Sequence, residues 1–120
     1  MSEVTSHKVN GLNELLRIEV LDDPGPGNAC HQYSITPTIG NASGVRIDFQ
    51  KGPLKESPPN GLSNESLLAI VEHRLQGFQS GIYACRENAL ALTKIQEAMH
   101  WLHHRTRERV ARGVEGTSQK

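Results

Sequence analysis

Hydrophobic residues recur at intervals of three and four through the second half of the chain, a pattern that predicts helices. The first predicted helix begins after Ser63, whose side chain suits an N-cap, and Glu65 in its first turn complements the helix dipole. Its apolar face is formed by Leu67, Val71, Leu75 and Phe78. Gly77 and Gly81 flank Phe78 and predict a break there, because glycine weakens helices.

A second and longer helix is predicted from Gly81 to Arg112, which is 32 residues or about 48 Å of unbroken helix. Its apolar residues repeat as in a coiled coil and lie on one face: Cys85, Leu92, Ile95, Met99 and Leu102. A single shorter helix and a small sheet cannot cover a seam of this length. The pattern therefore predicts that copies of the chain associate through the long helix.

Asn88 interrupts this apolar face, four residues before Leu92 and seven before Ile95. A buried amide needs hydrogen-bond partners, since leaving them unmade costs about 1–3 kcal/mol. Asn88 therefore either fixes the register of a helix–helix contact or reads the polar edge of a ligand, and the spacing alone does not choose between the two.

Alternation of apolar and polar residues predicts short strands in the first half of the chain. Residues 1–10 are polar and predict no element. Strands are expected within Leu12–Leu21, Cys30–Ile35 and Val45–Phe49. The sequence thus predicts an α+β fold with a small antiparallel sheet. We expect a single domain of residues 1–120, which comprises a β-rich part (11–50), a Pro/Gly linker (51–62) and a helical hairpin (63–117).

The chain has 120 residues, a formal net charge of +0 and a pI of about 7.0, which argues against a nucleic acid polymer as partner. Its two cysteines, Cys30 and Cys85, are too few for a disulfide framework and favour a reducing compartment. No apolar run approaches the roughly 18 residues of a transmembrane helix, and the N-terminus lacks the apolar segment of a signal peptide. We therefore expect no membrane partner.

Sequence motifs of catalysis are absent. The chain contains no Gly-x-Ser-x-Gly nucleophile elbow and no Gly-x-x-x-x-Gly-Lys phosphate loop. Cys85 is expected to be buried in the seam, which argues against a Cys–His nucleophile. Glu97, His100 and His104 share a helix face, but they supply only half of a di-iron motif, and the remaining carboxylates are missing. We expect no catalytic residue, no metal and no cofactor.

The end of the long helix is basic, with four arginines in its last turns: Arg105, Arg107, Arg109 and Arg112. Such cations either stabilise the helix through its dipole or form a phosphate site, to which the arginine fork is suited. The following Gly113, Gly116 and Thr117 fit either a plain helix cap or a backbone site for an anion. The residues alone do not decide whether the arginines bind phosphate, or whether the segment after them binds an anion.

The segment ACRENALALTKIQEAMHWLHHRTRERVARGVEGT closely resembles the C-terminal helical hairpin shared by two families of phage proteins, the Thoeris anti-defence sponges and the anti-CBASS sponges. The strands before the hairpin make the Thoeris anti-defence family the better match, and the resemblance extends from about Phe49 to Thr117. It implies a non-enzymatic protein of the host bacterial cytoplasm, a homo-oligomer up to a hexamer with a dimer as building unit. The implied ligands are cyclic ADP-ribose isomers (glycocyclic ADP-ribose) and, at separate sites, cyclic di- or trinucleotides.

The resemblance also implies ligand contacts for Phe78, Asn88 and Arg105, and it favours ligand contact at the basic helix end by Arg109, Arg112, Gly113, Gly116 and Thr117. Arg105 lies 17 residues beyond Asn88, about 25 Å along a helix, so one chain cannot gather these contacts around one small ligand. We therefore expect a site shared between subunits. Two alternatives stay open: an enzyme that cleaves the same nucleotides, and an interaction module that uses its basic helix end.

Overall fold

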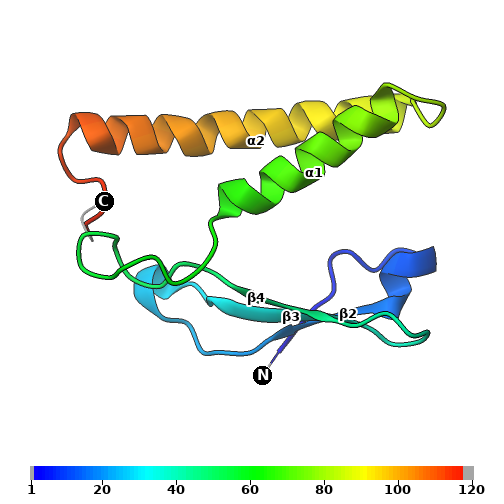
Figure 1. The fold of residues 1–120 in the computed structure, drawn as a ribbon, viewed down its shortest axis with the longest axis horizontal. Coiled ribbons are helices and arrows are strands. Elements are labelled where there is room, and N and C mark those ends of the chain that lie inside the picture. Colours follow the sequence, from blue (N-terminus) through cyan, green and yellow to red (C-terminus); the bar gives the residue numbers. More distant parts are fainter. Residues whose placement is uncertain (1, 118–120) are drawn as a thin grey trace. The chain divides into compact units, whose positions relative to one another are not determined.

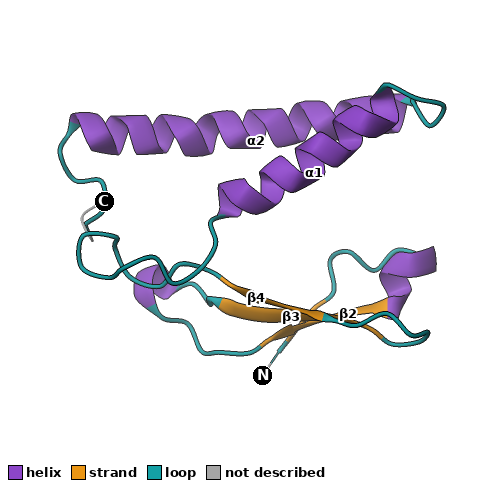
Figure 2. Ribbon diagram, viewed as in Figure 1, coloured by secondary structure: helices purple, strands orange, loops and turns teal. Residues whose placement is uncertain are grey.

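The computed structural model describes residues 2–117, in which four strands are followed by two helices (Figure 1, Figure 2). This order confirms the predicted α+β class. The described residues form two compact units: a sheet unit of residues 2–52 and 57–62, and a hairpin unit of residues 53–56 and 63–117.

The sheet unit is an antiparallel meander in which each strand pairs with the next along the chain. Its strands are β1 (Glu3–Val4), β2 (Leu16–Val20), β3 (Gln32–Pro37) and β4 (Val45–Asp48). Ile18 lies opposite Ile35 and Tyr33 opposite Ile47, so apolar side chains pair across the strands. Val20, at the end of β2, is 8% exposed and is the most deeply buried hydrophobic residue among those described.

The N-terminal edge of the sheet differs from the sequence prediction. Residues 3–4 form β1 and pair with Ile18 and Glu19, although no element is predicted in residues 1–10. A two-residue strand contains too little alternation to be recognised. Residues 11–15 form a 3-10 helix that is not predicted, and β2 follows it within the predicted stretch Leu12–Leu21, at the alternating residues 16–20.

Hydrogen bonds of polar side chains stabilise the loop that follows β4. Asn60 accepts the Lys51 N–H at 2.8 Å and donates to the Lys51 carbonyl at 2.9 Å. Gln50 Oε1 accepts the Asn60 N–H at 2.8 Å. The Leu62 N–H then donates to the Asp48 carbonyl at 2.8 Å, which returns the chain to the end of β4.

The hairpin unit contains α1 (Asn64–Gln79) and α2 (Arg86–Ala111), which pack against each other and are joined by a short turn (Figure 1). Ser63 caps α1 as predicted: its hydroxyl accepts the Ser66 N–H at 3.1 Å, and Ser66 Oγ accepts the Ser63 N–H at 3.2 Å. No hydrophobic residue described in this unit is fully buried. The apolar residues of α2 are half-buried at four positions: Leu92, Ile95, Met99 and Leu102.

The turn between the helices differs from the prediction at both ends. α1 continues through Gly77 and Phe78, and α2 begins at Arg86 rather than at Gly81. α2 therefore has 26 residues, about 39 Å. Cys85 has an extended backbone (φ −154°) and caps α2 from an exposed position, so the prediction that it is buried in the seam is wrong. Neither helix within residues 2–117 is long and apolar enough to cross a membrane.

Candidate functional site

An aromatic and amide cluster forms where the last turn of α1, the turn 80–85 and the first turn of α2 meet. The rings of Phe78 and Tyr83 meet edge to face, with centroids 6.1 Å apart and planes at 87°. The guanidinium carbon of Arg74 lies 5.0 Å from the centre of the Phe78 ring, at cation–π distance. Asn88 Nδ2 donates to the Tyr83 carbonyl at 3.5 Å, the long limit of a hydrogen bond. These four residues are called the turn cluster below: Arg74, Phe78, Tyr83 and Asn88.

Local hydrogen bonds fix the path of the chain through the turn cluster. Ser80 Oγ donates to the Gly77 carbonyl at 2.8 Å at the end of α1, and Gln79 Oε1 accepts the Cys85 N–H at 3.0 Å across the turn. Cys85 Sγ accepts the Asn88 N–H at 3.4 Å. Within residues 2–117 the Asn88 side chain makes only its one long hydrogen bond, so its carboxamide retains an acceptor and a donor for a ligand.

Two members of the turn cluster, Tyr83 and Arg74, are not singled out from the sequence. Tyr83 is 67% exposed and supplies the second ring. Arg74 stands four residues before Phe78, a spacing that places both side chains on one face of a helix. Two signals in the sequence could have identified them: the spacing of four between Arg74 and Phe78, and an aromatic residue two positions after Gly81 in the predicted turn.

Arg105 lies outside the turn cluster. It is exposed on α2, 17 residues beyond Asn88, or about 25 Å along the helix. Within one chain the structure links Phe78 and Asn88 through Tyr83 but does not bring Arg105 to them. A small ligand at the turn cluster can therefore meet Arg105 only if that residue belongs to another copy of the chain.

The end of α2 is a glycine cap. Gly113 has a left-handed backbone (φ 74°), and its N–H donates to the Val110 carbonyl at 3.0 Å. The Val114 N–H donates to the Arg109 carbonyl, also at 3.0 Å. These two bonds constitute a Schellman motif. The backbone N–H groups of Gly113 and Val114 are thus used by the cap, which leaves groups further along the tail for any anion.

Arg109 is the most deeply buried residue described in the hairpin unit, at 5% exposure. Its Nη2 donates to the carbonyls of Val114 and Thr117, each at 3.0 Å, and its Nε lies 3.3 Å from the Glu115 carboxylate. A buried guanidinium persists only with such partners. Arg109 resembles its neighbouring arginines in the sequence, but in the structure it binds the C-terminal tail to α2, whereas Arg105, Arg107 and Arg112 are exposed.

The tail also contacts residues 53–56 of the same unit. The Gly116 carbonyl accepts the Lys55 N–H at 3.0 Å, and Gly116 has a φ of 80°. Thr117 donates both its N–H and its hydroxyl to the Val114 carbonyl. The residues predicted at this end thus form one substructure, called the C-terminal hook below: Arg109, Arg112, Gly113, Gly116 and Thr117.

Two of the histidines of α2 form an aromatic group with the single tryptophan of the chain. The rings of His100 and His104 are stacked with centroids 6.4 Å apart, and Trp101 meets each of them edge to face. Within residues 2–117 no group of three or more His, Cys, Asp or Glu side chains is placed to hold a metal ion.

Comparisons with known proteins bear on the hairpin in particular. A family model described as Acb2/Tad1, hairpin domain, matches residues 41–107, more than half of the chain. The protein Thoeris anti-defense 1 of Bacillus phage SBSphiJ7 is 54% identical over 74 residues, which cover 62% of this chain and 52% of that protein. The chain thus spans about half the length of this relative. The family match includes the turn cluster and Arg105, and it ends before Arg109.

Proposed function

Because this chain belongs to the Acb2/Tad1 hairpin-domain family, we propose that it is a phage anti-defence protein that binds and sequesters cyclic ADP-ribose-type signalling nucleotides without degrading them. Sequestering a ligand such as glycocyclic ADP-ribose in the host bacterial cytoplasm would block Thoeris immunity. The observation that carries this proposal is the turn cluster. It lies within the matched residues 41–107 and combines an aromatic ring, a carboxamide and a guanidinium.

Each side chain of the proposed site suits one part of such a nucleotide. Phe78 offers a ring for the adenine, and stacking of a base is worth about 1–3 kcal/mol. Asn88 can hydrogen-bond a base or ribose edge, and Tyr83 extends the aromatic surface. Arg105 of a neighbouring copy would pair with the pyrophosphate, because a guanidinium matches phosphate oxygens bidentately.

Association of the chains is the second part of the proposal: a homo-oligomer, hexameric and built from dimers. Both helices of the hairpin expose large apolar side chains, namely Ile70 (65%), Leu90 (47%), Trp101 (66%) and Val110 (60%). Apolar surface of this extent is typical of a contact surface. A site that draws Arg105 from a second copy depends on this association.

A second ligand class, the cyclic di- or trinucleotides of CBASS immunity, is assigned in this proposal to the C-terminal hook. Arg112 and the backbone around Gly116 and Thr117 would meet the phosphates, and Arg109 would hold the tail in shape. Gly116→Val should weaken cyclic dinucleotide binding, because a side chain at φ 80° is strained and would meet Lys55.

Gly40→Val is the matched control for the hook, because Gly40 also has a positive φ (83°) but no atom within 4 Å of an added Cβ. It should leave the binding of both ligand classes unchanged. Equal cyclic dinucleotide binding by the two valine variants in calorimetry would remove the hook from the proposed ligand site.

Recovery of the ligand separates sequestration from cleavage. The protein is incubated with glycocyclic ADP-ribose, passed through a desalting column and heated until it denatures, and the supernatant is analysed by mass spectrometry. Intact ligand supports sequestration, and cleavage products would establish an enzyme instead. The double variant Phe78→Ala, Asn88→Ala is the control, and it should retain little ligand on the column.

A shared site also predicts complementation between variants. Subunits with only Phe78→Ala and subunits with only Arg105→Ala should co-assemble and restore some sites, wherever an intact Phe78 meets an intact Arg105. Calorimetry on the mixed oligomer should show a minority of tight sites. Uniformly weak binding in a verified mixture would contradict a site built from two chains.

A further inference from the structure

Arg74 is a member of the turn cluster to which the proposed function assigns no contact with the ligand. It is the only lysine or arginine between residues 64 and 85, that is, in α1 and the turn after it. Its guanidinium carbon lies 5.0 Å from the centre of the Phe78 ring, and the residue is exposed. Because Phe78 is itself half-buried, the guanidinium covers the solvent-facing side of its ring.

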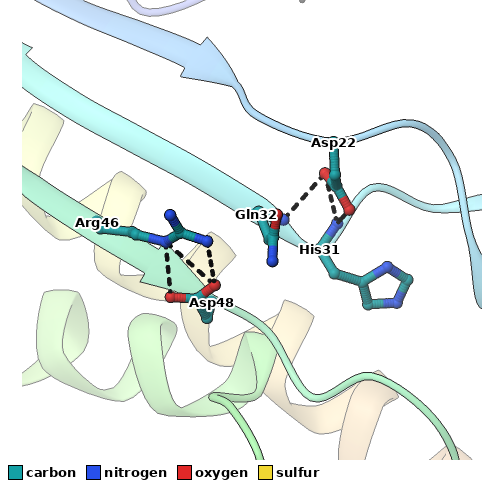
Figure 3. A network of polar contacts seen from close by, with 5 residues as sticks. All are labelled: Asp22, His31, Gln32, Arg46 and Asp48. Atoms are coloured by element: carbon teal, nitrogen blue, oxygen red, sulfur yellow. Dashed lines mark hydrogen bonds and ion pairs between the residues drawn. The ribbon is translucent and has the colours of Figure 1, made fainter.

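The charge of Arg74 has no carboxylate partner among the described residues. In the sheet unit, Arg46 binds the Asp48 carboxylate through hydrogen bonds of 3.1–3.3 Å (Figure 3). The Arg74 side chain makes no ion pair and no hydrogen bond within residues 2–117. The positions three and four residues away on α1 hold no acid: Ile70, Val71, Gly77 and Phe78. The Phe78 ring is thus the one group that compensates this guanidinium, through a cation–π contact that is weak at an exposed site.

A nucleotide base would compete with Arg74 for the Phe78 ring. Stacking of a base on an aromatic side chain is stronger than an exposed cation–π contact, so the base wins this competition. A Cβ added at the neighbouring Gly77 meets no atom within 4 Å, so the backbone beside the ring does not block a ligand. The displaced guanidinium stays attached to the same face of α1 as Phe78, which keeps it near the edge of the base.

The phosphates of the proposed ligand call for a second cation beside this ring. A cyclic ADP-ribose isomer has two phosphate groups, each with a negative charge, whereas the proposed site supplies them only with Arg105 of a neighbouring copy. One guanidinium binds one phosphate bidentately. On the basis of the proposed function, we propose that Arg74 is a ligand-binding residue that leaves the Phe78 ring when the base stacks there and pairs with one phosphate, while Arg105 of the neighbouring copy pairs with the other.

Arg74→Gln tests this role, because glutamine keeps the helix propensity of arginine but carries no charge. In calorimetry the variant should bind glycocyclic ADP-ribose at least about tenfold more weakly than the unmutated chain, as expected for the loss of a hydrogen bond from a charged donor. Adenosine has the base but no phosphate, so it should bind the variant no more weakly than the unmutated chain. A merely structural role of Arg74 would weaken the binding of both ligands.

Arg86→Gln is the matched control, because it removes the same charge at the first residue of α2. Arg86 lies over no aromatic ring in the described part of the chain, and the control should bind glycocyclic ADP-ribose like the unmutated protein. NMR spectra of the unmutated chain labelled with ¹⁵N test the displacement itself. The ring current of Phe78 shifts the Arg74 Nε–H signal in the free chain, and glycocyclic ADP-ribose should move this signal.

Four results would overturn the role of Arg74 and leave sequestration standing. They are unchanged affinity of Arg74→Gln for glycocyclic ADP-ribose, an equal loss in Arg86→Gln, an equal loss for adenosine, and an Arg74 Nε–H signal that the bound ligand does not move. Absence of glycocyclic ADP-ribose binding by the unmutated chain would instead contradict the sequestration proposal, and the role of Arg74 with it. If Arg74→Gln does not fold, the Nε–H signal of the unmutated chain decides.

Discussion

Each unit of the chain contains one phenylalanine and one tyrosine, and in each unit the two rings meet edge to face. Tyr33 and Phe49 have centroids 5.7 Å apart and planes at 88°, while Phe78 and Tyr83 have centroids 6.1 Å apart and planes at 87°. These four residues are all the phenylalanines and tyrosines of the sequence. The same ring geometry thus occurs in two surroundings, and the surroundings determine whether the rings are available to a ligand or another chain.

Strand pairing holds the rings of the sheet unit. Tyr33 lies opposite Ile47, the Phe49 N–H donates to the His31 carbonyl at 2.7 Å, and both rings are half-buried. In the hairpin unit Tyr83 is 67% exposed and lies in a turn. The first pair therefore contributes mainly to the stability of its own unit, whereas the second leaves aromatic surface available to a ligand or another chain.

The largest effect is expected from a charge in the apolar face of α2. Ile95→Asp places a carboxylate at a half-buried position that the proposed assembly would bury further, and an unpaired buried charge costs several kcal/mol. Since about 1.4 kcal/mol is a factor of ten, association should weaken by more than about a hundredfold. In sedimentation the unmutated protein should be an oligomer and Ile95→Asp a monomer.

Two further variants control this experiment. Ile39→Asp adds the same charge at a loop position of the sheet unit that is 65% exposed, and it should leave the assembly intact. Trp101→Asp changes a side chain that is 66% exposed in the single chain, so it should dissociate the assembly while circular dichroism shows an unchanged hairpin. A monomeric unmutated protein would contradict the proposed assembly directly.

The next largest effect concerns the C-terminal hook, which depends on the buried charge of Arg109. In the described part of the sheet unit no arginine is buried. Arg109→Ala removes two hydrogen bonds from a charged donor, each worth about 1.5–3 kcal/mol. Loss of one such bond already corresponds to roughly 10- to 150-fold faster opening of the tail, measured as hydrogen exchange of the Thr117 amide. Arg107→Ala, at an exposed position of the same helix, should exchange like the unmutated protein. Similar exchange in both variants would show that the tail does not depend on Arg109.

The range over which a feature is determined decides how well the sequence predicts it. The cap at Ser63 and the strands β2 and β4 depend on residues a few positions apart, and the structure confirms them. The helix break is misplaced, because α1 tolerates Gly77 and the turn is instead set by the side-chain bonds of Ser80 and Gln79. Such bonds cross the turn and leave no periodic signal.

The candidate sites show the same limit. Helical spacing and family resemblance lead to Phe78 and Asn88, but the place of Tyr83 depends on the path of a turn. Arg109 and Arg112 look alike in the sequence, and only the course of the tail buries the first and exposes the second. In the sheet unit, a pocket is lined by residues 31–32, 48–49, 51 and 60, which no local pattern connects.

A smaller effect separates the two ring pairs directly. Phe78→Ala should weaken glycocyclic ADP-ribose binding by about 1–3 kcal/mol, or roughly 5- to 150-fold, through lost stacking, with little change in melting temperature. Phe49→Ala should lower the melting temperature and leave nucleotide affinity unchanged. Because Phe49 is only half-buried, the free energy of unfolding should fall by less than the about 3–5 kcal/mol typical of a fully buried phenylalanine. Calorimetry and thermal melts on both variants test this division, and loss of affinity in both or in neither would refute it.

The smallest expected effect is the acid response of the sheet unit. Desolvation raises the pKa of Asp22, but hydrogen bonds from the His31 and Gln32 N–H groups and the charge of Lys51 outweigh it, so the pKa lies below its ordinary value of 3.8. A carboxyl group with a lowered pKa stabilises the folded state above its unfolded pKa, and this contribution is lost as the pH falls through 3.8 and below. Asp22→Asn keeps one acceptor oxygen but cannot titrate, so its urea midpoint should fall less steeply than that of the unmutated protein between about pH 5 and pH 2. Asp23→Asn, at the exposed neighbouring position, is the matched control, and parallel slopes for the two variants would show that Asp22 does not govern the acid response.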